Sequence, residues 1–197
     1  MPVEGQPAHA LRGDGHDATT GPPMSVETIR RGRRFDFQVV RETLPTGRVI
    51  EREVVRHPGA AVVLALDDAG RIAMIRNWRV AVGRWVWELP AGTLEPSEPA
   101  DRCAARELEE EAGLRAARLE HLGVFYTTPG MTDERMHAFL ATGLARVGQR
   151  LEDDERIEVH PTPVHEALAM IDDGRLMDAK SMLAILLAHR RGLLPDA

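Results

Sequence analysis

Cysteine and long apolar runs are both scarce in this sequence of 197 residues. The single cysteine, Cys103, excludes an internal disulfide, as expected in a reducing compartment. No apolar stretch reaches the about 18 residues that a membrane-spanning helix needs. The first residues also lack the basic flank and apolar run of a signal peptide. These absences predict a cytoplasmic protein with no membrane partner.

Excess positive charge and several catalytic motifs are missing too. The net charge is -6 and the pI is near 5.8, whereas nucleic-acid-binding domains usually present clustered Lys and Arg. We therefore predict no nucleic-acid partner. The sequence has no His pair spaced as in a zinc hydrolase helix, no Walker-type phosphate loop, and no arguable Ser-His-Asp arrangement. With 43% hydrophobic and 28% charged residues, it is typical of a soluble globular domain.

The hydrophobic pattern divides the chain into three parts. Residues 1–24 are rich in Gly, Pro, Ala, Asp and Thr without periodicity, which predicts a disordered tail. Residues 25–57 predict an N-terminal antiparallel segment, with strands at 35–44 and 48–57 joined by the turn residues 45–47. Residues 58–197 form the main domain.

The main domain alternates between strand and helix patterns. Two apolar runs, 60–66 and 71–78, flank a turn and predict a hairpin of buried strands. A helix is predicted from about Glu98 to Ala112, with Ser97 or Glu98 as its cap, Pro99 in its first turn and Gly113 at its exit. Further strands and helices are expected at 84–89, 119–127, 136–142, 155–160, 165–174 and 178–192. Helices covering a mixed sheet predict an α/β fold, an α/β/α sandwich.

The predicted helix carries an unusual density of carboxylates. Four lie within five positions: Glu107, Glu109, Glu110 and Glu111. Residues three or four apart share a helix face, so Glu107 lies beside Glu110 and Glu111, and like charges repel there. Hard divalent cations relieve such repulsion, and Mg²⁺ held by carboxylates often takes its other ligands from substrate phosphates. Phosphate chemistry is therefore the first hypothesis.

The same segment resembles the Nudix box in full. It reads Gly92, five residues, Glu98, seven residues, then Arg106-Glu107-Leu108, one residue, Glu110-Glu111, one residue and Gly113-Leu114. An acidic solvated helix face would explain the charges but not the fixed flanking residues. The resemblance implies hydrolysis of nucleoside diphosphates linked to another group, with Mg²⁺ or Mn²⁺ as the cofactor.

The resemblance also assigns roles within the box. Glu107 and Glu111 match metal ligands, Glu110 matches a further ligand with a part in catalysis, and the backbone carbonyl of Ala91 matches another ligand. Arg106 is assigned to catalysis by orienting the acidic cluster. A general base is expected from a carboxylate outside the helix. Glu155 in the acidic run 151–159 matches it best, Glu152 and Asp153 compete, and a merely solvated loop is the alternative.

Three features resemble the ADP-ribose pyrophosphatase branch: the run from Trp87 to Gly92, Pro129 in its loop, and Asp178-Ala179-Lys180. This resemblance covers roughly residues 34–194 and implies conversion of ADP-ribose to AMP and ribose 5-phosphate. It also implies a homodimer that exchanges the N-terminal segment, an ordinary hairpin on one subunit being the alternative.

Substrate contacts follow from the same resemblance. Arg79 matches a phosphate-binding arginine, Glu88 is a candidate for binding substrate or metal, and Phe37 or Phe35 is a candidate for stacking on adenine. Two other functions stay open. One is a Nudix pyrophosphatase for another nucleotide sugar such as GDP-mannose, and the other is a non-catalytic ligand-binding regulator.

Overall fold

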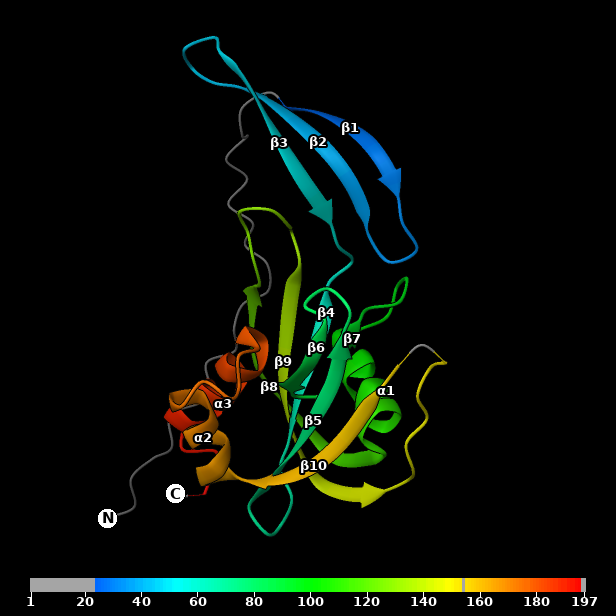
Figure 1. Cartoon of the computed structure of the whole chain (residues 1–197), viewed down its shortest axis with the longest axis vertical. Coiled ribbons are helices and arrows are strands. Elements are labelled where there is room, and N and C mark those ends of the chain that lie inside the picture. Colours follow the sequence, from blue (N-terminus) through cyan, green and yellow to red (C-terminus); the bar gives the residue numbers. More distant parts are fainter. Residues whose placement is uncertain (1–23, 154, 196–197) are drawn as a thin grey trace, which may run out of the picture.

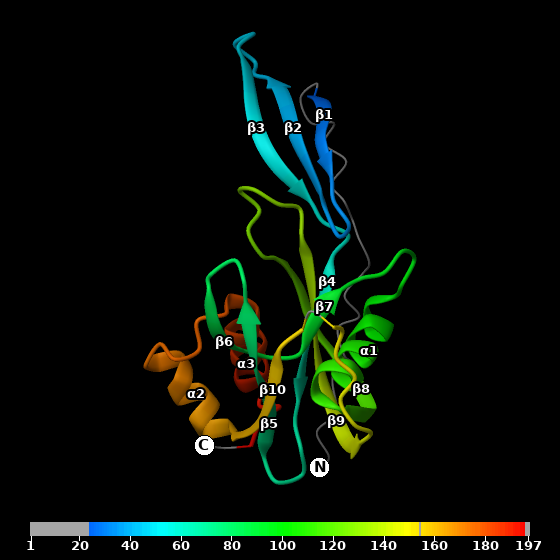
Figure 2. The ribbon, with the colours of Figure 1, turned by 45° about the vertical axis from the view of Figure 1, so that its right-hand side comes forward.

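The first three strands form a sheet of their own. The structure is a computed structural model that describes residues 24–153 and 155–195, so the predicted tail lies outside the described residues except for Met24. Strands β1 (Met24–Arg31), β2 (Asp36–Thr43) and β3 (Val49–Arg56) pair antiparallel in that order. In Figures 1 and 2 this sheet projects from one end of the molecule.

The N-terminal sheet contains the expected turn and one strand that the sequence did not predict. Gly47, with φ 81°, donates its N–H to the carbonyl of Leu44 at 2.8 Å in the turn between β2 and β3. The additional strand is β1, every residue of which is exposed. The sheet is tied to the main domain where Val55 N donates to the carbonyl of Met131 at 2.9 Å.

The main domain contains two further sheets. Strand β4 (Ala60–Ala65) runs parallel to β9 (Arg135–Arg146) and antiparallel to the short β7 (Ala91–Thr93), and β8 (Leu114–Tyr126) completes a mixed sheet of order β7-β4-β9-β8. The second sheet has the order β10-β5-β6. Its strands are β5 (Arg71–Arg79), β6 (Arg84–Glu88) and β10 (Ile157–Pro163).

The predicted hairpin of strands 60–66 and 71–78 is wrong in its pairing. The turn itself is present, since Asp67 N donates to the carbonyl of Arg71 at 2.9 Å. Only the bridge between Leu66 and Ile72 joins the two runs before β4 and β5 enter different sheets. The reason is competition for strand edges: β4 takes β7 and β9 as neighbours, and β5 takes β6 and β10.

Helices cover both sides of the mixed sheet, which confirms the α/β/α sandwich. Figures 1 and 2 place α1 (Ala100–Ala112) on one side, and α2 (Val164–Asp172) and α3 (Ala179–Arg190) on the other. Alternate residues of β4 point to opposite faces, so Val63 packs with Leu108 of α1 and Leu64 packs with the cluster around Ile185 of α3. Within the described residues, no helix is long and apolar enough to cross a membrane.

The N-terminal end of α1 differs from the prediction, and the C-terminal end agrees with it. The helix begins at Ala100 after Pro99, and neither Ser97 nor Glu98 caps it through a side chain. Its exit is as predicted, because Gly113 has φ 65° and ends the helix in the left-handed conformation. A Cβ at Gly113 would lie 2.7 Å from the backbone nitrogen of Gln149, so this position also lacks space.

Gly113→Ala should therefore destabilise the fold more than Gly83→Ala. Both positions have positive φ, which costs a non-glycine residue about 1 to 2 kcal/mol, but Gly83 has open space around its Cβ position. The clash at Gly113 should add about 1 to 3 kcal/mol. Chemical denaturation of both variants measures the difference, and equal losses of unfolding free energy would contradict the close approach of residues 148–149 to the helix end.

Candidate functional site

Helix α1 packs two carboxylates against the backbone of β7. Glu107 and Glu111 are only 8% and 3% exposed. The Oε2 of Glu111 accepts a hydrogen bond from the N–H of Ala91 at 2.7 Å. A Cβ at Gly92 would lie 1.8 Å from Oε1 of Glu107, so the absence of a side chain there makes room for the carboxylate.

Arg106 donates hydrogen bonds to several carboxylates of the cluster. Its Nε and Nη2 donate to the two oxygens of Glu98, each at 2.9 Å. Its Nη1 donates to Glu107 at 2.6 Å and to Glu110 at 3.1 Å, and Nη2 also reaches the carbonyl of Thr93 at 3.2 Å. Arg106 therefore contacts three carboxylates of the acidic cluster, and its part in catalysis stays a prediction.

The electrostatics of the two inner carboxylates differ from those of surface residues. The pKa of Glu111 is raised to about 8, chiefly by burial and also by the charges of Glu107 and Glu155, while the hydrogen bond from Ala91 opposes the rise. Burial also raises the pKa of Glu107, although Arg106 lowers it. Burial and mutual repulsion therefore disfavour the state in which both carboxylates are ionised. A nearby positive charge would stabilise that state.

The donor set fits a hard divalent cation. Glu107, Glu110 and Glu111 offer carboxylate oxygens on one helix, and the backbone of Ala91 lies beside them. Glu107 and Glu110 are turned onto Arg106, and the described residues form no closed group of three His, Cys, Asp or Glu side chains around a possible metal position. Water or substrate oxygens would have to complete the coordination, which is common for Mg²⁺.

In the acidic loop between β9 and β10, the three candidates for the general base have different surroundings. Glu155 is half-buried, and its charge acts on both Glu107 and Glu111. Its Oε2 accepts the backbone N–H of Glu152 at 2.9 Å. The Glu152 carboxylate is instead exposed and lies 3.3 Å from Nη2 of Arg34. Asp153 is exposed as well. Glu155 is thus the one of these three carboxylates whose charge acts on the buried pair, and its role as the base stays a prediction.

The predicted substrate residues Arg79 and Glu88 contact each other. Nε and Nη2 of Arg79 donate to the two Glu88 oxygens at 2.6 and 2.5 Å. Glu88 is 2% exposed, whereas the Arg79 side chain is 42% exposed and is influenced by the charge of Glu111. Arg79 therefore lies at the rim of the acidic cluster, and its guanidinium is fixed by the buried Glu88 carboxylate.

Comparison with known proteins shows the family of this chain. The family model of the NUDIX domain matches residues 55–183. The chain belongs to the Nudix family. An ADP-ribose pyrophosphatase of Bacillus subtilis is 40% identical over 82% of this chain and 89% of its own length. A methanol dehydrogenase activator of Bacillus methanolicus is 37% identical over the same shares. An ADP-ribose pyrophosphatase of Mycobacterium tuberculosis is 37% identical over 88% of this chain and 84% of its own.

A solved structure supports the fold of this Nudix chain. The crystal structure of an ADP compounds hydrolase matches with a TM-score of 0.76 at 22% identity, covering 88% of this chain and 96% of its own. At that identity the match shows a shared fold.

Phe37 is not brought to the acidic cluster within one Nudix subunit. It lies on β2, in the sheet that projects away from α1 and β7 in both ribbon views. Phe35, 51% exposed, stacks on His57 with ring centroids 6.3 Å apart. Either ring would need a second subunit to approach the site, so adenine stacking stays a prediction.

Sequence reasoning gave no role to three residues at the start of α3. Lys180 donates to Glu88 at 2.7 Å and to Asp178 at 2.9 Å. Ser181 accepts the N–H of Leu89 at 2.7 Å. Burial would lower the pKa of Lys180, but the charges of Glu88 and Asp178 raise it above its usual value. One signal was available, because Lys180 is the only lysine in the sequence.

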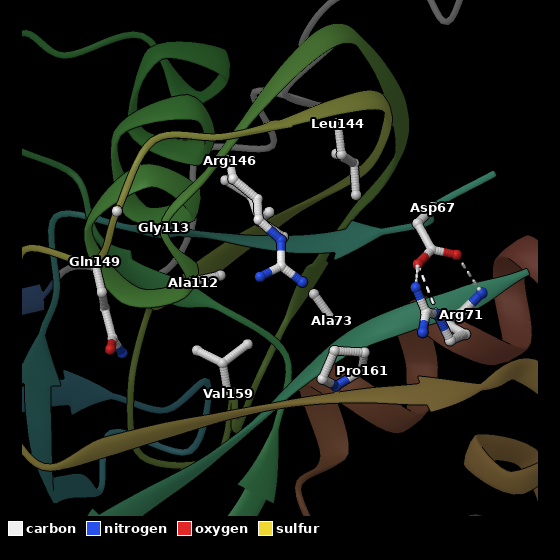
Figure 3. Close-up of a pocket in the computed structure, with 12 residues that line it drawn as sticks. Asp67, Arg71, Ala73, Ala112, Gly113, Leu144, Arg146, Gln149, Val159 and Pro161 are labelled. Atoms are coloured by element: carbon white, nitrogen blue, oxygen red, sulfur yellow. Dashed lines mark hydrogen bonds and ion pairs between the residues drawn. The ribbon is translucent and has the colours of Figure 1, made fainter. Parts of the chain in front are cut away.

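A pocket of about 500 Å³ lies apart from the Nudix carboxylates, at the C-terminal end of α1. Its apolar walls include Ala73, Leu144 and Val159, and Figure 3 shows the Arg146 side chain pointing into it. Gln149, at its edge, donates to the carbonyl of Glu111 at 2.7 Å. The pocket shares no lining residue with the acidic cluster, although it borders the same helix.

Gly92→Ala should disrupt the acidic cluster more than Gly130→Ala. The new methyl group would occupy the position of the Glu107 carboxylate, whereas Gly130 has nothing within 4 Å of its Cβ position. We expect Gly92→Ala to weaken Mn²⁺ binding at least about tenfold, since it would displace Glu107, which the sequence predicts to be a metal ligand. Calorimetric titration of metal-free protein measures this, and wild-type affinity in Gly92→Ala would show that Glu107 is not held as described.

Proposed function

We propose that this protein hydrolyses the diphosphate of ADP-ribose to AMP and ribose 5-phosphate with Mg²⁺ as its cofactor. The observation that carries the proposal is the pair of buried carboxylates, Glu107 and Glu111, packed on the backbone of β7, with Glu155 near enough for its charge to act on both. The substrate class is supported by two similar chains that are named ADP-ribose pyrophosphatase.

The proposed ligands of the cation are Glu107, Glu111, Glu110 and the carbonyl of Ala91. When bound, a divalent cation offsets negative charge on phosphate oxygens and lowers the pKa of water. Glu155 accepts the proton of the attacking water, whose oxygen bonds to one phosphorus while the bond from that phosphorus to the bridging oxygen breaks. Arg106 takes part by keeping Glu107 and Glu110 in place. Mn²⁺ is the expected substitute for Mg²⁺.

Arg79 is proposed to bind the substrate diphosphate. Two of its nitrogens are occupied by Glu88, and no described residue hydrogen-bonds to its Nη1. A guanidinium fixed on one edge offers its other edge to an anion at the rim of the acidic cluster. Glu88, buried and paired, acts in this proposal by holding Arg79 and not as a metal ligand.

A homodimer with exchanged N-terminal sheets is proposed as the working form. Apolar side chains of the projecting sheet are exposed by 37% to 61%, among them Met24, Val26, Ile29, Phe35 and Phe37. Such a surface favours a protein partner, and a second copy would cover it while bringing Phe37 to the adenine of the other subunit. The proposed compartment is the cytoplasm, because the only cysteine is free and buried.

The substrate proposal predicts AMP release that depends on Mg²⁺. ADP-ribose should be hydrolysed faster than ADP-glucose, GDP-mannose or a nucleoside triphosphate at equal concentration. Glu111→Gln should lower kcat by about three orders of magnitude because it removes an anionic ligand, and it should keep the fold because the amide replaces a buried carboxylate. Faster turnover of GDP-mannose would overturn the substrate, and an active Glu111→Gln enzyme would overturn its role.

The base assignment predicts unequal effects within the acidic loop. Glu155→Gln should lower kcat by about 100-fold or more with little change in KM, since a positioned general base contributes about that much. Glu152→Gln is the matched control, because Glu152 faces Arg34 at the surface. Initial rates of both variants with ADP-ribose test this, and equal losses would remove Glu155 as the base.

A further inference from the structure

Lysine occurs once in this chain, at a position that is largely buried. The sequence has 24 arginines and one lysine, Lys180. Surface positions that need a cation therefore carry arginine, whereas the lysine side chain is only 14% exposed. A lysine ammonium is compact and presents three donors at one point, while a guanidinium is larger and planar. The exception suggests that a point cation is required at this position.

Lys180 connects the start of α3 to the strand that carries Glu88. Its Nζ lies 2.7 Å from Oε2 of Glu88 and 2.9 Å from Oδ1 of Asp178. Asp178 is itself fixed as the N-cap of α3, where Oδ2 accepts the N–H of Ser181 at 3.1 Å. Lys180 is therefore anchored to a helix terminus, and it transfers that fixed position to Glu88.

Glu88 in turn is shared between two cations. Its Oε1 accepts from Nε of Arg79 at 2.6 Å, while its Oε2 accepts from both Nη2 of Arg79 and Nζ of Lys180. Glu88 is only 2% exposed, so its carboxylate depends on these two cations for donors. Without Lys180 one oxygen loses a donor, and the carboxylate is free to rotate about a single partner.

We propose that Lys180 is a positioning residue that acts through Glu88 to fix the Arg79 guanidinium for the substrate diphosphate. The proposal rests on the proposed function, in which Arg79 binds that diphosphate. The Arg79 side chain is 42% exposed and flexible by nature, so its orientation depends on the buried carboxylate behind it. Preorganisation of this kind reduces the entropy lost when substrate binds.

A double-mutant cycle tests this coupling. Lys180→Met should raise KM for ADP-ribose about tenfold and change kcat less than about twofold, because the phosphate contact is used in both ground and transition states. In an Arg79→Met background, Lys180→Met should change KM by less than about twofold, because its effect passes through Arg79. Arg175→Met, which removes a cation paired with Glu166 on α2 and with Asp173 directly after that helix, is the control and should leave KM unchanged.

A second measurement does not require the Lys180 variant to fold. Protein labelled with ¹⁵N-lysine has one ammonium resonance, because the chain has one lysine side chain. The resonance should shift when the α,β-methylene analogue of ADP-ribose saturates the wild-type protein with Mg²⁺. An unmoved resonance at saturation, or a Lys180→Met effect that is equally large without Arg79, would overturn the proposal.

These outcomes are distinct from failure of the proposed function. If wild-type protein does not hydrolyse ADP-ribose, the function fails first, and the cycle is then run with the substrate that is turned over. If wild-type protein hydrolyses ADP-ribose but Lys180 and Arg79 act additively, the function stands and only the role of Lys180 fails.

Discussion

Packing of two carboxylates against a strand backbone is the constraint on which the rest of this Nudix site depends. Burying ionisable groups is unfavourable, and the structure compensates with one hydrogen bond from Ala91, one guanidinium from Arg106 and a missing side chain at Gly92. Two of these compensations come from β7 and one comes from α1 itself. The position of β7 beside α1 is therefore as important to the chemistry as the acidic residues themselves.

The placement of β4 and β5 in different sheets also positions the site. Because β5 pairs with β6 and β10 and not with β4, one sheet supports α1 while the other carries Arg79, Glu88 and the strand that follows Glu155. The carboxylates thus lie on the helix that packs on one sheet, and the proposed phosphate contact lies on the other sheet. Gln149 joins the two sides, since its amide donates to the carbonyls of Glu111 and Ile157 at 2.7 and 3.3 Å.

Local features of the sequence predicted the local structure of the site well. The box spacing identified the family, and Gly113 marked the end of α1 because a left-handed residue there favours glycine. The partners of β5 were not predicted, because strand pattern carries no information about which edge a strand will meet. The link from Lys180 to Glu88 was also missed, since these residues are 92 positions apart and only the fold brings them together.

The scarcity of lysine has a chemical consequence for an enzyme that handles sugars. A substrate such as ADP-ribose, with a free aldehyde in its open form, condenses with uncharged amines to form Schiff bases. Arginine, which supplies 24 of the 25 basic side chains, stays protonated and does not offer such an amine. The one lysine side chain is enclosed by two carboxylates that keep it an ammonium ion. Schiff-base formation between side chains of this protein and the compound it is proposed to cleave is therefore disfavoured.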